Sequence, residues 1–348
     1  MSTPARPAPR AAVGFVTAAL LVAVTAACTD APGQGPTGSP TSSPSAPSTG
    51  GAATVRPTPP PAPGTLRAAF DEPVRAGGLR GAGPVVDLGP YTRREVRYRS
   101  DDLTVSGVLF VPDGPGPHPA VVLNHGYIDP DRYVSGQGMP REQDLLARRG
   151  WVVLHTDYRG HAGSDDVSGL AHELRVGYAR DAIAAVKVLR ERDDVDPDRV
   201  AMLGRSMGGG VTLSALTIEP DVVDAAVIHA SVSSRFRDNL RRWTVPERPE
   251  RVSALEERFG PIDGDAPAWS DLSPRSAFER IEADVLALHG VRDETCPIGW
   301  ARATDRALTE SGVNARLVEY GGEGHTFAAA WPDAMDRTIR FLERSFEG

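Results

Sequence analysis

A serine at position 206 stands in the pattern Gly204-Arg205-Ser206-Met207-Gly208, between an apolar run at 200–203 and a segment of helical periodicity. Glycine two residues to either side of a serine permits a sharp, strained strand-to-helix turn. Such a turn lifts the hydroxyl above a sheet and places a helix N-terminus beneath it. A hydroxyl presented in this way becomes a nucleophile once a base removes its proton. The pattern therefore predicts that Ser206 is a catalytic nucleophile.

A serine nucleophile needs a general base and an acid that orients the base, and in this architecture both follow the serine, acid first. Asp293 ends the segment His289-Gly290-Val291-Arg292-Asp293 after a buried strand-like run. His325 ends Gly321-Gly322-Glu323-Gly324-His325 after the last such run. Both would lie at carboxyl ends of strands, beside the serine. We therefore assign His325 as general base and acid, and Asp293 as its orienting acid.

Other acids and histidines compete for these roles. His229 and His289 lie in strand-like runs or at their ends, where a packed or hydrogen-bonded histidine is the expected role. Asp284 begins its run and so faces the opposite edge of the sheet, whereas Glu294 remains an alternative acid.

The tetrahedral intermediate of acyl transfer needs two hydrogen-bond donors for its oxyanion. One is expected to be the backbone N–H of Met207, directly after the nucleophile. The other is expected from the loop Asn124-His125-Gly126-Tyr127, which follows an apolar run. We assign it to the N–H of Tyr127, with Gly126 supplying backbone freedom. His125 precedes the nucleophile in the chain, which favours a supporting role in the loop.

The elements that must position these residues alternate between strand and helix patterns from about Tyr91. This alternation predicts an α/β fold with a mainly parallel central sheet flanked by helices. An opening antiparallel pair is expected at 94–99 and 103–111, and further strands at 120–123, 152–156, 200–203, 225–229, 285–289 and 315–320. Helices are expected at 143–149, 176–192, 207–217, 298–311 and 332–346.

The alternation breaks between about 232 and 273, where charged residues surround Trp243, Phe259 and Trp269. Because open α/β sheets bind ligands at the carboxyl ends of their strands, this insertion is interpreted as a cap over the site. The alternative is a solvated surface excursion.

The first 28 residues have the character of an export signal. Arg6 and Arg10 precede an apolar run of 17 residues from Ala11 to Ala27, which is short for a membrane span. The small residues before Cys28 resemble the lipobox of bacterial lipoproteins, although Thr25 stands where leucine is usual. We expect Cys28 to be lipidated and to hold the protein on the extracellular face of the membrane. Ordinary signal cleavage with secretion, or an uncleaved anchor, is the alternative.

Residues 29–85 are predicted to form a disordered tether. Between 29 and 65, 28 of 37 residues are Pro, Gly, Ser or Thr, which cannot bury enough apolar surface to offset the entropy of ordering. The remaining residues, 86–348, suffice for one catalytic domain with the cap at about 232–273.

The overall composition excludes some classes of protein. With 46 acidic against 38 basic residues and a net charge of −8, general affinity for nucleic acid is not expected. Two cysteines provide neither a disulfide framework nor a cysteine-based zinc site. Oligomeric state is left open.

Together these motifs resemble the α/β-hydrolases, and more narrowly the catalytic domain of the prolyl oligopeptidase (S9) family. The resemblance covers about residues 94–346. Its pieces are Asn124-His125-Gly126, Asp-Tyr-Arg-Gly-x-x-Gly-Ser at 157–164, the turn at 204–208, Ser273-Pro274, His289-Gly290-x-x-Asp293 and Gly322-Glu323-Gly324-His325-x-Phe327. It implies a Ser/Asp/His hydrolase that cleaves peptide or ester bonds through an acyl-enzyme, without a metal or organic cofactor. In the stretch at 157–164 we expect a structural turn, with Arg159 in an internal ion pair.

The chain departs from the family at several points. It has no room for the N-terminal β-propeller of large members, and Cys296-Pro297 replaces the usual Val-Pro. Met207 and the three glycines after it also resemble secreted lipases and polyester hydrolases. An S9-like peptidase is therefore the first interpretation, a carboxylesterase, lipase or polyester hydrolase the second. A non-catalytic binding module on a hydrolase fold is the alternative of another class.

Overall fold

The computed structural model describes residues 60–347. The predicted signal segment, Cys28 and most of the predicted tether lie outside the described residues. Within 60–347, no helix is both long enough and apolar enough to cross a membrane.

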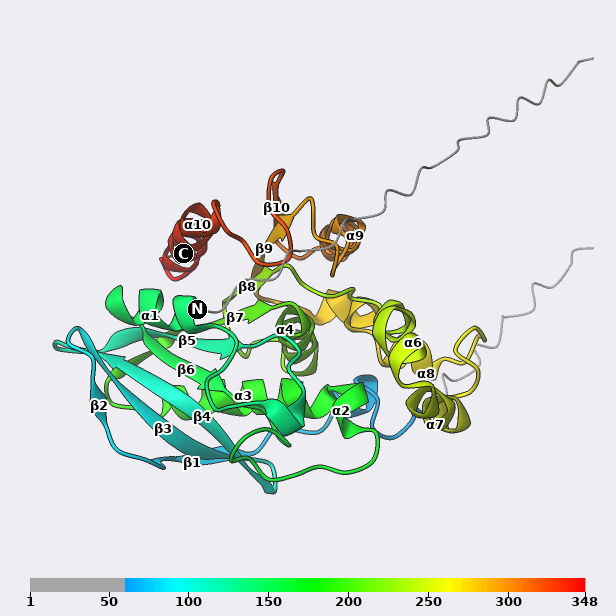
Figure 1. The fold of residues 1–348 in the computed structure, drawn as a ribbon, viewed down its shortest axis with the longest axis horizontal. Helices are drawn as coiled ribbons and strands as arrows, with labels where there is room; N and C mark the ends of the chain where they lie inside the picture. The colour runs from blue at the N-terminus through cyan, green and yellow to red at the C-terminus, as the bar shows by residue number, and fades with distance from the viewer. Residues whose placement is uncertain (1–59, 348) are drawn as a thin grey trace, which may run out of the picture. The chain divides into compact units, whose positions relative to one another are not determined.

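A ten-stranded sheet runs through the molecule in the order β1-β3-β4-β6-β5-β7-β8-β9-β10, with β2 paired to β3 (Figure 1). Strands β5 to β10 are parallel to one another, whereas β1 to β4 pair antiparallel and β4 joins β6 antiparallel. The strands are β1 (Ala76–Gly81), β2 (Val86–Asp87), β3 (Tyr91–Ser100), β4 (Leu103–Pro112), β5 (His118–Asn124), β6 (Val152–Thr156), β7 (Val195–Arg205), β8 (Ala225–His229), β9 (Asp284–Gly290) and β10 (Ala315–Tyr320). The predicted α/β-hydrolase architecture is confirmed.

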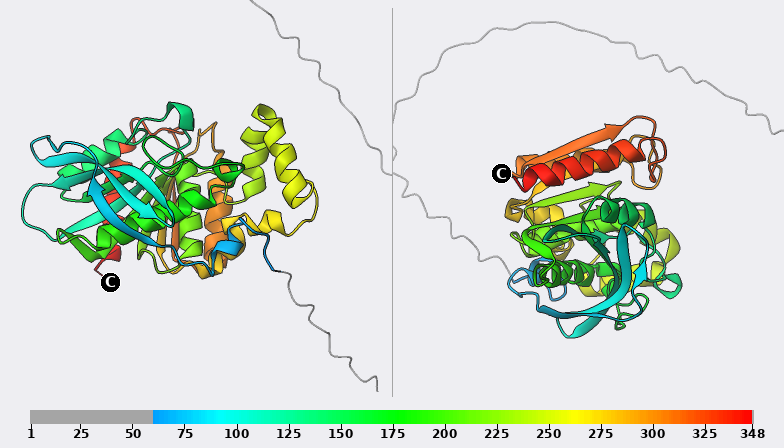
Figure 2. Two further views of the ribbon diagram at one scale, coloured as in Figure 1. Left: turned by 90° about the horizontal axis from the view of Figure 1, so that it is seen from below. Right: turned by 90° about the vertical axis from the view of Figure 1, so that its left-hand side faces the viewer.

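Helices cover both faces of this sheet. The helices are α1 (Pro140–Arg148), α2 (Ala171–Leu174), α3 (Val176–Arg190), α4 (Met207–Ile218), α5 (Phe236–Asn239), α6 (Val245–Glu247), α7 (Pro249–Phe259), α8 (Ala268–Asp271), α9 (Ile298–Glu310) and α10 (Trp331–Ser345). One apolar core lies between the sheet and α3 and α4, and a second lies between the sheet and α1 and α10. Helix α10 and strand β10 lie at one edge of the sheet, far from β1 (Figure 2).

The order of the parallel strands produces a divergence beside the predicted nucleophile. Strand β5 has β6 on one side and β7 on the other. After β5 the chain continues to β6 on one side, and after β7 it continues to β8 on the other side. Open α/β sheets bind ligands at the carboxyl ends of the strands where such a reversal occurs. The loop after β5 carries Tyr127, and the turn after β7 carries Ser206.

The predicted tether is wrong for residues 60–85. Leu66, Ala69 and Val74 are buried in the core on the α3 side, and β1 pairs antiparallel with β3. The Lys187 ammonium also donates a hydrogen bond to the Val74 carbonyl at 3.0 Å. The Pro- and Gly-rich composition ends at about residue 65, and apolar residues that follow it pack against the core.

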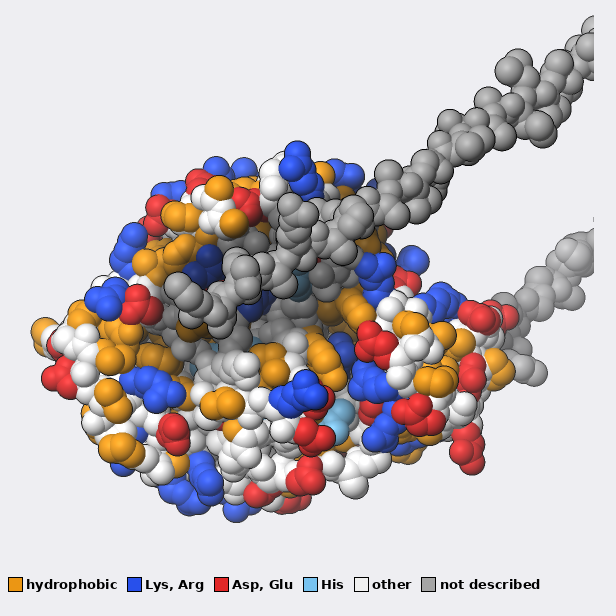
Figure 3. Space-filling model, viewed as in Figure 1, with side chains coloured by type: hydrophobic (Ala, Val, Ile, Leu, Met, Phe, Trp, Pro, Cys, Tyr) orange, Lys and Arg blue, Asp and Glu red, His pale blue; other side chains and the backbone are white. Residues whose placement is uncertain are grey.

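The insertion predicted between 232 and 273 is helical. It contains α5, a π-helical turn at Leu240–Thr244, and α6 to α8, which enclose a small apolar cluster around Leu255 and Trp269. These helices lie beside the sheet (Figure 1). On the face displayed in Figure 3, acidic and basic side chains are interspersed.

Candidate active site

The turn after β7 holds Ser206 in a conformation that few side chains adopt. Its φ of 57° and ψ of −120° are unusual for a residue other than glycine, and such strain is characteristic of functional sites. The Ser206 N–H donates to the His229 carbonyl at 2.9 Å, which ties the turn to β8. Helix α4 begins at Met207, so its N-terminus lies directly under the serine.

The two glycines of this turn are required by close approach. A Cβ on Gly208 would lie 1.8 Å from the Asn124 carbonyl oxygen, and a Cβ on Gly204 would lie 2.3 Å from the Gly208 carbonyl oxygen. Real Cβ atoms essentially never come this close to backbone atoms, so larger residues would push β5, β7 and α4 apart. The sequence interpretation of the glycine spacing thus has a specific steric basis.

Asp293 and His325 are joined as the sequence predicted. The Nδ1 atom of His325 lies 2.9 Å from Oδ2 of Asp293. The Asp293 side chain is fully shielded from solvent, whereas that of His325 is 25% exposed. The other oxygen, Oδ1, accepts hydrogen bonds from the N–H groups of Thr295 at 2.9 Å and Cys296 at 2.8 Å. The carboxylate is therefore fixed in place and orients the His325 ring through its Nδ1 atom.

These contacts keep Asp293 ionised. Burial by itself would raise the pKa of this carboxyl, but hydrogen bonds from His289 and His325 and from the Cys296 N–H lower the pKa below its ordinary value. An ionised acid at this position favours the histidine tautomer with its proton on Nδ1. The Nε2 atom of His325 is then unprotonated and can accept a proton.

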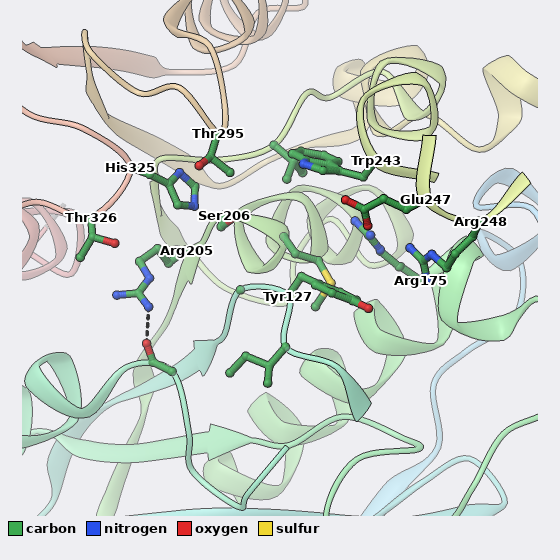
Figure 4. Close-up of a pocket in the computed structure, with 15 residues that line it drawn as sticks. Tyr127, Arg175, Arg205, Ser206, Trp243, Glu247, Arg248, Thr295, His325 and Thr326 are labelled. Atoms are coloured by element: carbon green, nitrogen blue, oxygen red, sulfur yellow. Dashed lines mark hydrogen bonds between the residues drawn. The ribbon is translucent and has the colours of Figure 1, made fainter. Parts of the chain in front are cut away.

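Ser206 and His325 face a common cavity of about 390 Å³. The loop after β5, the turn after β7 and the helical insertion all contribute to its wall (Figure 4). From the insertion come Trp243, Glu247 and Arg248. The insertion thus contributes wall residues to the cavity that holds the serine.

The loop after β5 lies against the serine. A Cβ on Gly126 would lie 3.2 Å from the Ser206 Cβ, so glycine here permits close approach. The backbone freedom expected of Gly126 is not required here, because its φ is not positive. In the described part of the chain, the N–H groups of Tyr127 and Met207 donate no hydrogen bond, which leaves both available to a ligand. His125 is buried and contacts the Gly126 carbonyl through Nδ1 at 2.7 Å.

The competing residues have other partners. His229 pairs through Nε2 with the Thr338 hydroxyl at 2.9 Å. His289 pairs through Nε2 with the Cys296 carbonyl at 2.7 Å and lies 3.3 Å from Asp293. Asp284 begins β9, at the far edge from the cavity. The two histidines are therefore buried and hydrogen-bonded, as the sequence indicated.

Arg159 forms the expected internal ion pair. Its guanidinium contacts the carboxylate of Asp181 at 2.7 Å, and the Asp181 side chain is fully buried. The turn at 157–164 is thereby attached to α3, and its role is structural.

Cys296 lies closer to the site than the sequence suggested. Its thiol is buried, and its Sγ atom lies within 4.8 Å of ligand atoms of both Asp293 and His325. Burial, and then the nearby Asp293 carboxylate, raise the pKa of the thiol to about 12. The thiol therefore stays protonated, and it contacts the Ser206 hydroxyl as well as lying beside the acid and the histidine.

Two arginines of the cavity wall, Arg175 and Arg248, were not singled out from the sequence. Arg175 lies in the break between α2 and α3, and Arg248 precedes α7. Neither stands in a motif, and their convergence on the cavity depends on how the insertion packs. No signal in a single sequence marks them.

Comparison with known proteins agrees with this geometry. The model of the family described as "Prolyl oligopeptidase family" matches residues 138–348. The chain belongs to the prolyl oligopeptidase family. The match includes Ser206, Asp293 and His325, and it leaves the loop of Tyr127 outside.

Two curated relatives are distant from this chain and longer than it. The chain is 25% identical over 261 residues to the uncharacterized peptidase YuxL of Bacillus subtilis, covering 73% of this chain and 38% of YuxL. It is 25% identical over 253 residues to the acylamino-acid-releasing enzyme of Rattus norvegicus, covering 69% of this chain and 33% of that enzyme. The chain thus spans about a third of the length of these two relatives.

Solved structures share the fold. Acetyl xylan esterase 1 from Thermoanaerobacterium matches with a TM-score of 0.61 at 20% identity, covering 82% of this chain and 95% of that one. This likeness places the fold among the α/β-hydrolases.

Proposed function

We propose that this protein is a serine hydrolase of the prolyl oligopeptidase family that cleaves peptide or ester bonds through an acyl-enzyme. The observation that carries the proposal is the Asp293–His325 contact at 2.9 Å beside a strained serine in one cavity. Acyl transfer requires an ionised, buried acid, a partly exposed histidine and a serine on a sharp strand-to-helix turn.

In this mechanism the Ser206 hydroxyl attacks the substrate carbonyl while Nε2 of His325 accepts its proton. Asp293 stabilises the resulting imidazolium. The N–H groups of Met207 and Tyr127 donate to the oxyanion, and the N-terminus of α4 favours the negative charge. His325 then protonates the leaving group, and water attacks the acyl-enzyme by the same route to release the acid.

A fluorophosphonate probe and a p-nitrophenyl ester test the proposal. We expect the probe to label Ser206 and the Ser206→Ala variant to lose both labelling and at least about 10⁴-fold in kcat. Ser253→Ala, which alters an exposed serine on α7, is the matched control and should keep both. Absence of a covalent adduct at Ser206 in the native protein would instead favour a binding module on a hydrolase fold.

The peptidase activity is supported by the names of two curated relatives, a peptidase and an acylamino-acid-releasing enzyme. The esterase is supported by Met207 and the glycines after it, which resemble secreted lipases. Parallel assays with aminoacyl p-nitroanilides and short acyl esters separate the two. Amide turnover comparable to ester turnover excludes a pure esterase, and ester turnover alone excludes the peptidase.

We further propose that Cys28 is lipidated and anchors the protein on the outer face of the cell membrane. The support is the apolar run followed by small residues and a cysteine. A Cys28→Ala variant should lose incorporation of labelled palmitate and move from the membrane fraction. Unchanged lipid labelling in that variant would contradict the proposal.

A further inference from the structure

The guanidinium of Arg175 lines the same cavity as Ser206 but has no protein partner. Among residues 60–347 it forms no hydrogen bond and no ion pair. Its Nε atom is shielded from solvent and unsatisfied. A partly buried cation without a hydrogen-bonded partner is unfavourable, and a bound anion would supply one.

The other arginines of the cavity are paired. Arg248 lies 3.5 Å from the Glu173 carboxylate. Arg205 contacts the Gly138 carbonyl and lies 3.8 Å from Glu142. Glu247 also lines the cavity but forms no ion pair with Arg175. Arg175 is therefore the cation of this wall whose charge is available to a bound molecule.

The backbone at Arg175 is strained. Its φ of 59° and ψ of 4° place a long side chain in the left-handed region, between the end of α2 and the start of α3. Bulky residues seldom adopt this conformation, and it persists where the surrounding structure requires it. Here it accompanies a guanidinium that lines the cavity. Burial, and then the nearby Arg248 cation, lower the pKa of this guanidinium.

The position of Arg175 relative to the serine indicates which part of a substrate it meets. In Figure 4, Ser206 lies between His325 on one side and Arg175 on the other. Because His325 must protonate the leaving group, that group departs on the histidine side. The acyl part of the substrate then extends from Ser206 toward Arg175.

There is room for such an acyl part. A second cavity of about 540 Å³ shares Tyr127, Arg175, Met207 and Arg248 with the first. The Arg248 guanidinium lies over the Tyr127 ring at 5.8 Å, where the two cavities meet. Arg175 thus stands where the two cavities meet.

We propose that Arg175 binds a carboxylate on the acyl part of the substrate, and that this hydrolase prefers acyl groups with a carboxylate a few bonds from the reacting carbonyl. A guanidinium matches a carboxylate with two parallel hydrogen bonds, and the low local dielectric strengthens them. The inference rests on the proposed hydrolase function and adds the substrate class to it.

Paired esters test the preference. p-Nitrophenyl hemiglutarate carries an acyl carboxylate, and p-nitrophenyl butyrate is its neutral counterpart. We expect Arg175→Gln to lower the hemiglutarate-to-butyrate ratio of kcat/KM by about 10- to 100-fold, the range for a hydrogen-bonded charge. Arg175→Lys should keep part of the ratio. Arg241→Gln, which removes an exposed arginine of the insertion, should keep all of it.

A ratio unchanged within twofold in Arg175→Gln, with butyrate turnover intact, would overturn the inference and leave the hydrolase function standing. Loss of both turnovers with a lowered melting temperature would report misfolding. If the variant misfolds, a binding measurement tests the carboxylate site instead. The same measurement tests the site if the native protein hydrolyses neither ester, which would mean that the proposed hydrolase function fails.

For that measurement, calorimetry compares glutaric acid monoanilide with butyranilide on Ser206→Ala. Preference for the anionic anilide, reduced about tenfold or more when Arg175→Lys is added, supports the carboxylate site. Equal binding of the two anilides to Ser206→Ala overturns it.

Discussion

Two groups of histidines and aspartates lie on either side of the Ser206 turn, and they differ in access to the cavity. On one side, Asp293 holds His325, whose side chain is 25% exposed. On the other side, Asp157 and the histidines at 125, 155 and 161 form a buried histidine cluster with Tyr133 and Tyr158. The same residue types therefore serve chemistry in one place and packing in the other.

The partners of the two carboxylates explain the difference. Asp157 accepts hydrogen bonds from the hydroxyls of Ser106 at 2.6 Å, Ser135 at 2.6 Å and Tyr133 at 2.8 Å, and from the Gly136 N–H at 2.9 Å. Its oxygens are thus occupied by neutral donors of the fold. Asp293 instead gives one oxygen to backbone N–H groups and leaves the other for histidine. A histidine held by its acid and open to a cavity can exchange protons with a substrate.

The largest expected effect is a loss of kcat when the acid on the catalytic side, Asp293, is changed. Asp293→Asn should lower kcat by about 10⁴-fold, because the amide no longer favours the tautomer that leaves Nε2 unprotonated. Ester hydrolysis at pH 7, with circular dichroism to verify the fold, measures this. A loss of less than tenfold would mean that another acid, such as Glu294, orients His325.

The pH dependence of stability comes next. Burial lowers the pKa of His125, His155 and His229 to about 3. Below about pH 6.5 the unfolded chain binds a proton at each ring that the folded chain does not bind until about pH 3. The free energy of unfolding should therefore fall as pH falls, by up to about 4 kcal/mol per pH unit for three rings below pH 6.

Urea unfolding at pH 7, 6 and 5 checks this slope. His229→Gln removes one buried ring and should reduce the slope by about a third. An unchanged slope in that variant would show that His229 is already protonated in the folded protein.

Asp157→Asn is the structural counterpart of Asp293→Asn, since both make the same chemical change. The amide group cannot accept from all four donors, so the variant should lose about 3 kcal/mol of stability. Its kcat should stay within tenfold of the native value at a temperature where it is folded. A loss of kcat as large as that of Asp293→Asn would place the buried histidine cluster in the reaction.

The smallest effect is expected at Cys296, which is buried although it lies beside Asp293 and His325. Cys296→Val should change stability by less than about 1.5 kcal/mol and kcat by less than tenfold, because the protonated thiol acts as a small packed side chain. Urea unfolding and ester hydrolysis measure both. A larger loss of kcat at unchanged stability would assign the thiol a part in the chemistry.

The parts of the site that follow from local chain geometry could be predicted from the sequence. The glycine spacing around Ser206 reflects contacts with the adjoining strand and helix, and the apolar runs reflect strands buried on both faces. Asp293 and His325 could be assigned because they follow such runs in the chain order of the fold.

The parts that depend on contacts between distant segments could not be predicted. The composition of residues 29–65 suggested a tether that continued to 85, but Leu66 and Val74 pack on a core formed by later helices. Arg248 stands in no motif and reaches the cavity only because the insertion packs against the loop of Tyr127.

Short-range periodicity and local steric constraints were enough to predict the α/β order, the Ser206 turn and the acid–histidine pair. The packed molecule was needed to show which histidine opens onto the cavity and which arginine lacks a partner there. Exposure and charge pairing are properties of the packed surface, where residues from β5, α3, the insertion and β9 meet.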